Sequence, residues 1–185
     1  MFYNKKIFFI LIIIFFHTKV FASFKNEIIE KLKVIENVTF NFEQNINGKI
    51  EKGKCTIAYP KKIYCKYNLR NQKILVTNGK SLVIKTINGF YQYELDRTPL
   101  NFILDKEYLL KKLNMLDGKI VEKKFIHFSL IENDTKINLF FDKKTFNLVG
   151  WQTVDIYQNS SITYINSIIK NRKVKNNLFN LPDRN

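Results

Sequence analysis

The sequence predicts a mainly β protein with few helices, in which a curled antiparallel sheet forms an incomplete, open β-barrel. Three observations predict this class. Asn-Gly, the dipeptide most typical of a two-residue hairpin turn, occurs three times, at Asn47-Gly48, Asn78-Gly79 and Asn88-Gly89. Apolar and polar residues alternate between the turns, as in TKINLFF at 135–141. Helical patterns are confined to an N-terminal helix and two short central helices, which we expect to form a lid.

The first 22 residues predict a secretory signal peptide. Two lysines precede an apolar run at 7–16, and residues 20–22 offer the small side chains that a signal peptidase reads. The run is too short for the roughly 20 residues of a membrane-spanning helix. We therefore expect cleavage after Ala22 and a soluble, exported protein with one domain over 23–185; the alternative is an uncleaved anchor. Ser23 follows the cut, so no cysteine is available there for lipidation.

A helix and a hairpin begin the mature chain. The segment from Phe24 to Asn37 carries a helical stripe of apolar residues. A two-residue turn at Asn47-Gly48 then places Phe40 opposite Cys55 on the next strand.

The two cysteines are expected to form a disulfide. If Pro60 lies at the centre of the second turn, Cys55 faces Cys65 directly. Opposed Cβ atoms lie about 4.5–5.5 Å apart, within reach of a disulfide after modest adjustment, and an exported chain meets oxidising conditions. The alternative is two reduced cysteines packed as small hydrophobes. We expect no metal site, because two thiols and one mature histidine make a poor ligand set.

The third Asn-Gly turn extends the apolar face. A two-residue turn at Asn88-Gly89 pairs Ile84 with Tyr93 and Leu82 with Leu95. These residues share one side of the sheet, which is therefore wide and aromatic, and a sheet of about ten strands must curl. The interior so enclosed is either hollow or simply packed.

Two short amphipathic helices are expected to cover this face. Thr98-Pro99 predicts a helix start, with threonine as the N-cap and proline at the first helical position. Asp105 predicts the cap of a second helix. The apolar residues of the expected lid are Leu100, Ile103, Leu104, Leu109, Leu110 and Leu113.

The residues favour binding over catalysis. His127 stands alone in an apolar strand pattern, and there is no Gly-x-Ser-x-Gly elbow, phosphate-binding glycine loop or paired-histidine motif. We expect no enzyme activity and no cofactor. The net charge is +15 for the full sequence and +12 for the expected mature chain, an excess compatible with a partner that carries phosphates, such as nucleic acid or an anionic membrane. The lysines are spread along the chain, however, which favours a solvated surface and no nucleic-acid partner.

The order of several motifs resembles the periplasmic outer-membrane lipoprotein carrier family, LolA. The matching segments are Phe-x-Gln at 42–44, a strand that ends just before Pro60, an aromatic strand, and Thr-Pro-Leu at the start of the central helices. The resemblance spans the mature chain: FNFEQ at 40–44, GKCTIAYP at 53–60, IYCKY at 63–67, ILVTNGK at 74–80, TPL at 98–100, residues 151–168, and FNLP at 179–182.

The resemblance implies a periplasmic carrier without catalytic activity. It implies that acylated lipoproteins are received at the inner membrane from a release complex and delivered to an outer-membrane receptor, with transient contact to membrane surfaces. Members of the family often place arginine just before the strand-ending proline, where it pairs with the lid backbone and controls opening. Tyr59 stands there in this chain, and its hydroxyl offers at most one hydrogen bond to the lid.

We expect the cavity to be lined by residues on the dry face, with Tyr59 at its junction with the lid. They are Phe40, Phe42, Ile57, Tyr59, Ile63, Tyr67 and Tyr93. Two other functions fit the residues: a lipocalin-like binder of free lipid or glycolipid, and a basic module with a packed interior that binds anionic surfaces.

Overall fold

The computed structural model describes residues 23–154 and 158–184, so the predicted signal peptide at 1–22 lies outside the described residues. The strands are β1 (Asn37–Ile46), β2 (Lys49–Ala58), β3 (Lys62–Tyr67), β4 (Ile74–Asn78), β5 (Ser81–Lys85), β6 (Phe90–Glu94), β7 (Lys119–Val121), β8 (Phe125–Glu132), β9 (Thr135–Asp142), β10 (Leu148–Val154) and β11 (Ser160–Lys170). The helices are α2 (Ser23–Lys33), α3 (Leu100–Leu104) and α4 (Lys106–Met115), with short 3-10 turns η1 (Leu95–Arg97) and η2 (Asn176–Phe179).

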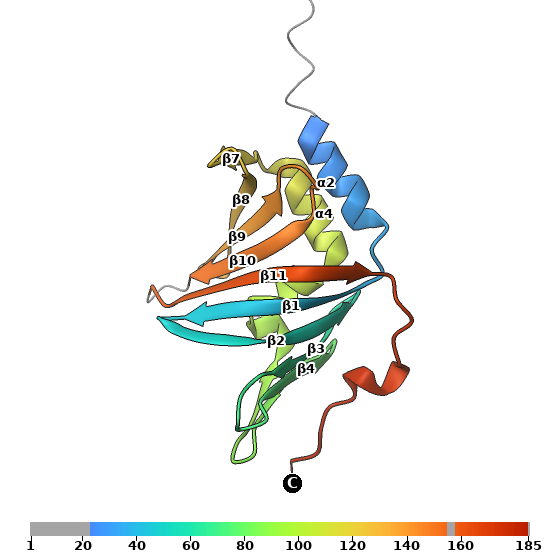
Figure 1. Cartoon of the computed structure of the whole chain (residues 1–185), viewed down its shortest axis with the longest axis vertical. Coiled ribbons are helices and arrows are strands. Elements are labelled where there is room, and N and C mark those ends of the chain that lie inside the picture. Colours follow the sequence, from blue (N-terminus) through green and yellow to red (C-terminus); the bar gives the residue numbers. More distant parts are fainter. Residues whose placement is uncertain (1–22, 155–157, 185) are drawn as a thin grey trace, which may run out of the picture.

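The strands form one 11-stranded antiparallel sheet in the order β6-β5-β4-β3-β2-β1-β11-β10-β9-β8-β7. The sheet does not close into a barrel, because β6 and β7 remain as its two edges. Every neighbouring pair joins consecutive strands except β1 and β11, which bring the two ends of the described chain together. Helices α2 and α4 lie side by side against one face of the curled sheet (Figure 1). The predicted fold class is confirmed.

Helix α2 buries the predicted apolar stripe but is shorter than expected. Ile28, Ile29 and Leu32 are buried against the core. The helix ends at Lys33 instead of Asn37. The reason lies far along the chain: the Asn171 side chain accepts from the Glu36 backbone N–H at 2.8 Å and donates to a carbonyl of the same turn, which holds this segment in an extended entry to β1.

The first two hairpins have the predicted registers. Phe40 pairs with Cys55, and Asn47 and Gly48 both have positive φ, as a two-residue turn of this kind requires. Cys55 pairs with Cys65 across β2 and β3, and the two residues are joined by a disulfide with Cα atoms 4.1 Å apart.

The predicted register of the β5–β6 hairpin is wrong by two residues. Leu82 pairs with Tyr93 and Ile84 with Tyr91. The loop covers 86–89, closed by a 2.8 Å hydrogen bond from the Thr86 N–H to the Gly89 carbonyl, so Asn-Gly does not occupy its centre. Leu95 therefore leaves the strand and is buried in η1.

The central helices form where predicted, with one different cap. The Asp105 side chain accepts from the Tyr108 N–H at 3.1 Å and so caps α4 as expected. Thr98 does not cap α3. It ends η1 instead: its backbone N–H and its hydroxyl both donate to the Leu95 carbonyl, at 3.0 and 2.8 Å.

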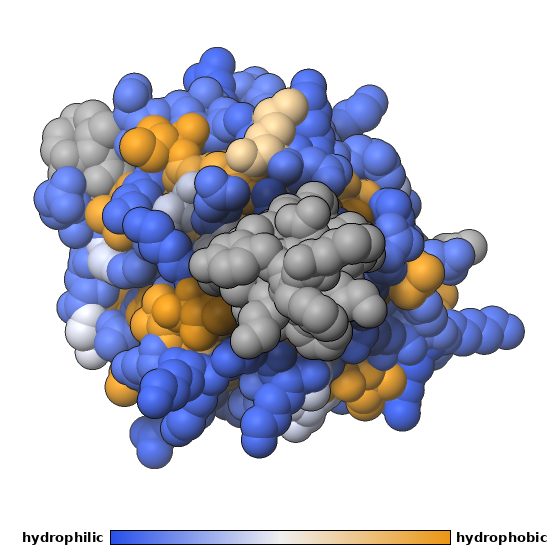
Figure 2. Space-filling view, turned by 90° about the horizontal axis from the view of Figure 1, so that it is seen from above, coloured by the Kyte–Doolittle hydropathy of each residue, from blue (hydrophilic) through white to orange (hydrophobic). Residues whose placement is uncertain are grey.

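The face of the molecule seen from above is mostly hydrophilic. In Figure 2, blue residues predominate and hydrophobic residues form small separate patches. Among residues 23–154 and 158–184, no helix is long and apolar enough to span a bilayer.

Candidate functional site

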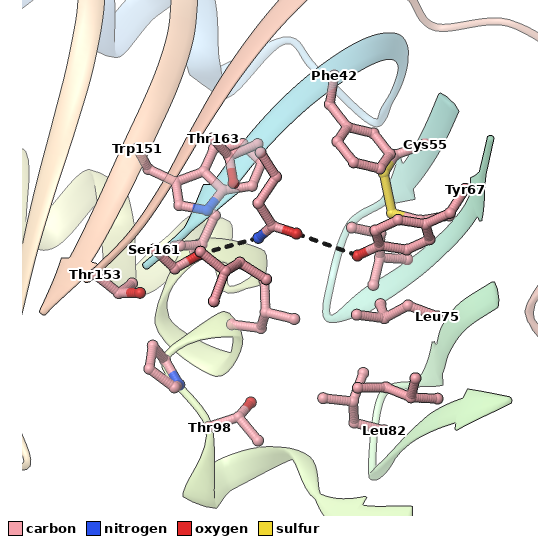
Figure 3. Close-up of a pocket in the computed structure, with 18 of the residues that line it drawn as sticks. Phe42, Cys55, Tyr67, Leu75, Leu82, Thr98, Trp151, Thr153, Ser161 and Thr163 are labelled. Atoms are coloured by element: carbon pink, nitrogen blue, oxygen red, sulfur yellow. Dashed lines mark hydrogen bonds between the residues drawn. A yellow bond between two sulfur atoms is a disulfide. The ribbon is translucent and has the colours of Figure 1, made fainter. Parts of the chain in front are cut away.

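A cavity of about 270 Å³ lies between the concave face of the sheet and the start of α3 (Figure 3). Strands β1 to β5 form one wall, and β10 and β11 form the other. Because side chains alternate across a strand, every second residue of these strands points inward. The cavity is lined mainly by apolar side chains: Phe42, Gln44, Ile46, Cys55, Ile63, Cys65, Tyr67, Lys73, Leu75, Leu82, Ile84, Thr98, Pro99, Leu100, Ile103, Trp151, Thr153, Ser161 and Thr163.

An aromatic pair and the disulfide shape the wall formed by β1 to β3. The Phe42 and Tyr67 rings meet edge-on, with centroids 5.0 Å apart. A Cβ at Gly53 would lie 2.8 Å from the Phe42 ring and 2.3 Å from the Lys66 carbonyl oxygen. Glycine at this position therefore allows Phe42 to lie flat over β2.

A polar cluster joins the two walls of the cavity. The Gln44 amide donates to the Ser161 hydroxyl at 3.0 Å and accepts from the Tyr67 hydroxyl at 3.4 Å, as the dashed lines in Figure 3 show. Burial, together with the nearby Glu51 charge, raises the pKa of Tyr67 well above its usual value. This side chain therefore stays a neutral donor.

One charged pair stands at the edge of the cavity. The Lys73 ammonium lies 2.5 Å from a Glu51 carboxylate oxygen and 4.2 Å above the Tyr67 ring centroid. Burial raises the pKa of Glu51, but hydrogen bonds and charge from Lys73 and Lys49 outweigh this effect, so the pKa lies below its usual value. Lys73 is thus already paired with an ionised partner.

A second, smaller cavity of about 30 Å³ lies on the other side of Trp151. Phe40 meets the Trp151 ring edge-on, with centroids 6.3 Å apart, and both side chains line this smaller space. Lys31 and Lys170 stand at its rim. The two rings therefore divide the interior into a large and a small compartment.

The structure distributes the predicted cavity residues over both compartments. Phe42, Ile63 and Tyr67 line the large cavity. Phe40, Ile57 and Tyr59 line the small one. Tyr93 lines neither, because it lies on the edge strand β6 and is 48% exposed.

The predicted lid residues also separate into two groups. Leu100 and Ile103 of α3 line the large cavity. The remaining four are buried in the core and line neither compartment: Leu104, Leu109, Leu110 and Leu113. Helix α4 thus packs as part of the core, and α3 covers the cavity.

The turn after β2 holds the junction between α3 and α4. The Lys61 N–H donates to the Leu104 carbonyl at 2.9 Å, and its ammonium lies 3.2 Å from the Asp105 carboxylate. Burial raises the pKa of Tyr59 to about 12. Within the described part of the chain, the Tyr59 hydroxyl has no hydrogen-bond partner. The one hydrogen bond that the Tyr59 hydroxyl could offer to the lid is not formed, and Lys61 contacts the junction of α3 and α4 instead.

The described ranges contain no candidate metal site. No three His, Cys, Asp or Glu side chains lie close enough there to hold a metal ion. His127 packs between Phe125 and Phe140 on the sheet face away from the cavity, and burial lowers its pKa.

Solved structures include similar chains at low identity, and one of the following three has a TM-score above 0.5. An uncharacterised conserved protein from Thermus thermophilus matches over 88% of this chain and 95% of that chain, at 7% identity and a TM-score of 0.52. A LolA superfamily protein from Nitrosomonas europaea covers 85% of this chain and 97% of that chain, at 9% identity and a TM-score of 0.44. Lipoprotein LppX of Mycobacterium tuberculosis covers 82% and 96%, at 8% identity and a TM-score of 0.43.

The family follows from the sequence itself. No curated protein matches the chain. The sequence profile described as "Outer membrane lipoprotein carrier protein LolA" matches residues 33–182, which include all strands of the sheet and all lining residues of the cavity. This chain therefore belongs to the LolA family.

Proposed function

We propose that this protein is a periplasmic carrier that binds the acyl chains of lipoproteins in the large cavity and moves them from the inner to the outer membrane. The observation that carries the proposal is the apolar cavity of about 270 Å³ beneath α3. Membership of a periplasmic family that binds lipids or lipoproteins supports it. The cavity approaches the roughly 300–1,000 Å³ typical of ligand sites.

The energetics require such a cavity. Each buried methylene contributes about 0.8 kcal/mol, so a dozen methylenes amount to roughly 10 kcal/mol. A carrier must also release its cargo, so part of this affinity has to be offset by opening the cover. Helix α3 suits that task because it is short and its end is held by one backbone hydrogen bond and one partly exposed ion pair from Lys61.

The partners of such a carrier are acylated lipoproteins, an inner-membrane complex that releases them and an outer-membrane receptor. Transient contact with anionic lipid headgroups fits the net charge, which is +15 for the full sequence and +12 without the three lysines of the segment 1–22. The proposal includes export by the segment 1–22 and one domain over 23–185.

A titration with a dansyl-labelled acyl probe tests uptake directly. Trp151 is the only tryptophan and lines the cavity, so energy transfer from its indole reports probe entry. Ile84 lines the cavity, whereas Ile87, on the same hairpin, is 62% exposed. We expect Ile84→Asp to weaken binding at least tenfold and Ile87→Asp to bind as the wild type does. Absence of uptake by the wild type would overturn the proposal.

A second measurement separates a lipoprotein carrier from a binder of free lipid. The protein is incubated with vesicles that contain a purified diacylated lipoprotein, and the vesicles are then sedimented. A carrier leaves a soluble one-to-one complex in the supernatant. If only phospholipid appears there, the protein binds free lipid and the carrier role is wrong.

A further inference from the structure

The wall of the large cavity formed by β10 and β11 contains hydrogen-bonding groups without partners. The Trp151 side chain is 7% exposed and lines the cavity, and its indole N–H has no hydrogen-bond partner among the described residues. Figure 3 shows the indole nitrogen turned toward Ser161 and the interior. Thr163 is 3% exposed, and its hydroxyl also has no partner in the described part of the chain.

These two groups are direct neighbours. Trp151 on β10 pairs with Thr163 on β11, which in turn pairs with Gln44 on β1. Gln44 and Ser161 already bond to each other, so the fully buried Thr163 hydroxyl is left unsatisfied. The Trp151 N–H faces the cavity without a hydrogen-bond partner among the described residues. A buried polar group without a partner costs about 1–3 kcal/mol, so a ligand that supplies one gains affinity.

The chemistry of the donor defines the ligand group. An indole N–H donates and cannot accept, so its partner must be an acceptor oxygen. Lys73 is the one charged side chain among the described residues that line the cavity, and Glu51 at 2.5 Å already neutralises it. A carboxylate in the cavity would therefore lose its hydration without gaining a cation as a partner. A neutral carbonyl oxygen has no charge to compensate, so the indole N–H is a sufficient partner.

We infer that Trp151, supported by Thr163, forms a carbonyl-binding subsite, and that the cavity selects ester- or amide-linked acyl chains over bare hydrocarbon and free fatty acid. This inference rests on the proposed function, since it specifies the ligand class of the same cavity. The carbonyl accepts from the indole N–H while the alkyl chain lies among the apolar walls.

Competition against the dansyl probe tests the subsite, with methyl palmitate, hexadecane and palmitate as competitors. The probe is excited directly and followed by its own emission, because the variants at position 151 lack the indole that serves as the energy-transfer donor. The key variant replaces only the indole N–H by sulfur, as benzothienylalanine at position 151, which is feasible because the chain has a single tryptophan. We expect this change to weaken methyl palmitate about three- to tenfold and to leave hexadecane unchanged. Because each competitor is compared with itself, differences in solubility cancel. Trp151→Phe serves as the genetic counterpart.

Thr163→Val provides an independent readout. Removal of an unpartnered buried hydroxyl should raise or preserve the melting temperature of the ligand-free protein, yet weaken methyl palmitate more than hexadecane. The inference is overturned if the sulfur analogue binds ester as the wild type does, if both neutral competitors weaken equally, or if palmitate is the tightest of the three. Failure of the wild type to take up any of the probes would instead contradict the proposed function.

Discussion

Glu51 is a buried carboxylate whose protonation should set part of the acid stability. It is 3% exposed and lies between the Lys73 and Lys49 ammonium groups at 2.5 and 3.2 Å. These partners depress its folded-state pKa, so its contribution is complete above the unfolded-state pKa and is lost as pH falls through the folded value. The relevant window is therefore acidic and begins near the ordinary value of 4.5.

We predict that the stability difference between the wild type and Glu51→Gln is constant at neutral pH and shrinks below about pH 4.5. Urea unfolding at a series of pH values measures this difference. Glu43→Gln is the matched control, since Glu43 forms an exposed pair with Lys52 and should change stability by less than about 0.5 kcal/mol throughout. A difference that grows on acidification would show that the Glu51 pKa is raised.

Helices α3 and α4 meet at Asp105, which combines two tasks. Its carboxylate caps α4 through the Tyr108 N–H and pairs with Lys61 at 3.2 Å. Removal of an N-cap costs about 1 kcal/mol, and a partly exposed ion pair adds little more. The main consequence of losing this carboxylate should therefore be that α3 opens more readily over the cavity.

We predict that Asp105→Ala destabilises the protein by about 1–2 kcal/mol and speeds probe release several-fold in stopped-flow displacement. Asp105→Asn keeps an N-cap acceptor but loses the charge, so it should retain stability while still speeding release. Asp117→Ala, near the other end of α4, is the control because its side chain is fully exposed. Equal release rates in all four proteins would show that this junction does not limit opening.

The whole molecule shows which parts of the fold are encoded locally. The Asn47-Gly48 and Pro60 turns fix their registers within a few residues, so the pairings of Phe40 with Cys55 and of Cys55 with Cys65 were predictable. The register predicted from Asn88-Gly89 was wrong, because the hydrogen bond from Thr86 to Gly89 closes a four-residue loop and not a two-residue turn. Local turn chemistry thus predicted the half of the cavity formed by β1 to β3.

The other half was not predictable from local signals. Trp151, Ser161 and Thr163 reach the cavity only because β1 pairs with β11, a contact between residues more than one hundred positions apart, such as Gln44 and Ser161. No turn sets that register. The four lid residues that prove to be core illustrate the same limit, since an amphipathic stripe does not distinguish a cover from a packed layer.

The division of the interior by Phe40 and Trp151 leads to a last prediction. Phe40 is almost fully buried and lines the small compartment beside Trp151. Phe40→Ala should join the two compartments at a cost of about 3–5 kcal/mol, because the surrounding core relaxes only partly. An apolar void of this kind binds apolar ligands, so longer acyl chains should recover part of the lost stability.

Thermal shifts with acyl probes of increasing chain length measure this effect. The gain in melting temperature should level off at a longer chain in Phe40→Ala than in the wild type. Phe128→Ala is the matched control: Phe128 is equally buried and meets Phe141 edge-on, but lines neither compartment. It should lose similar stability and keep the wild-type length preference. Identical preferences in all three proteins would mean that the compartments stay separate without the Phe40 ring, and that Trp151 alone sets the depth of the cavity.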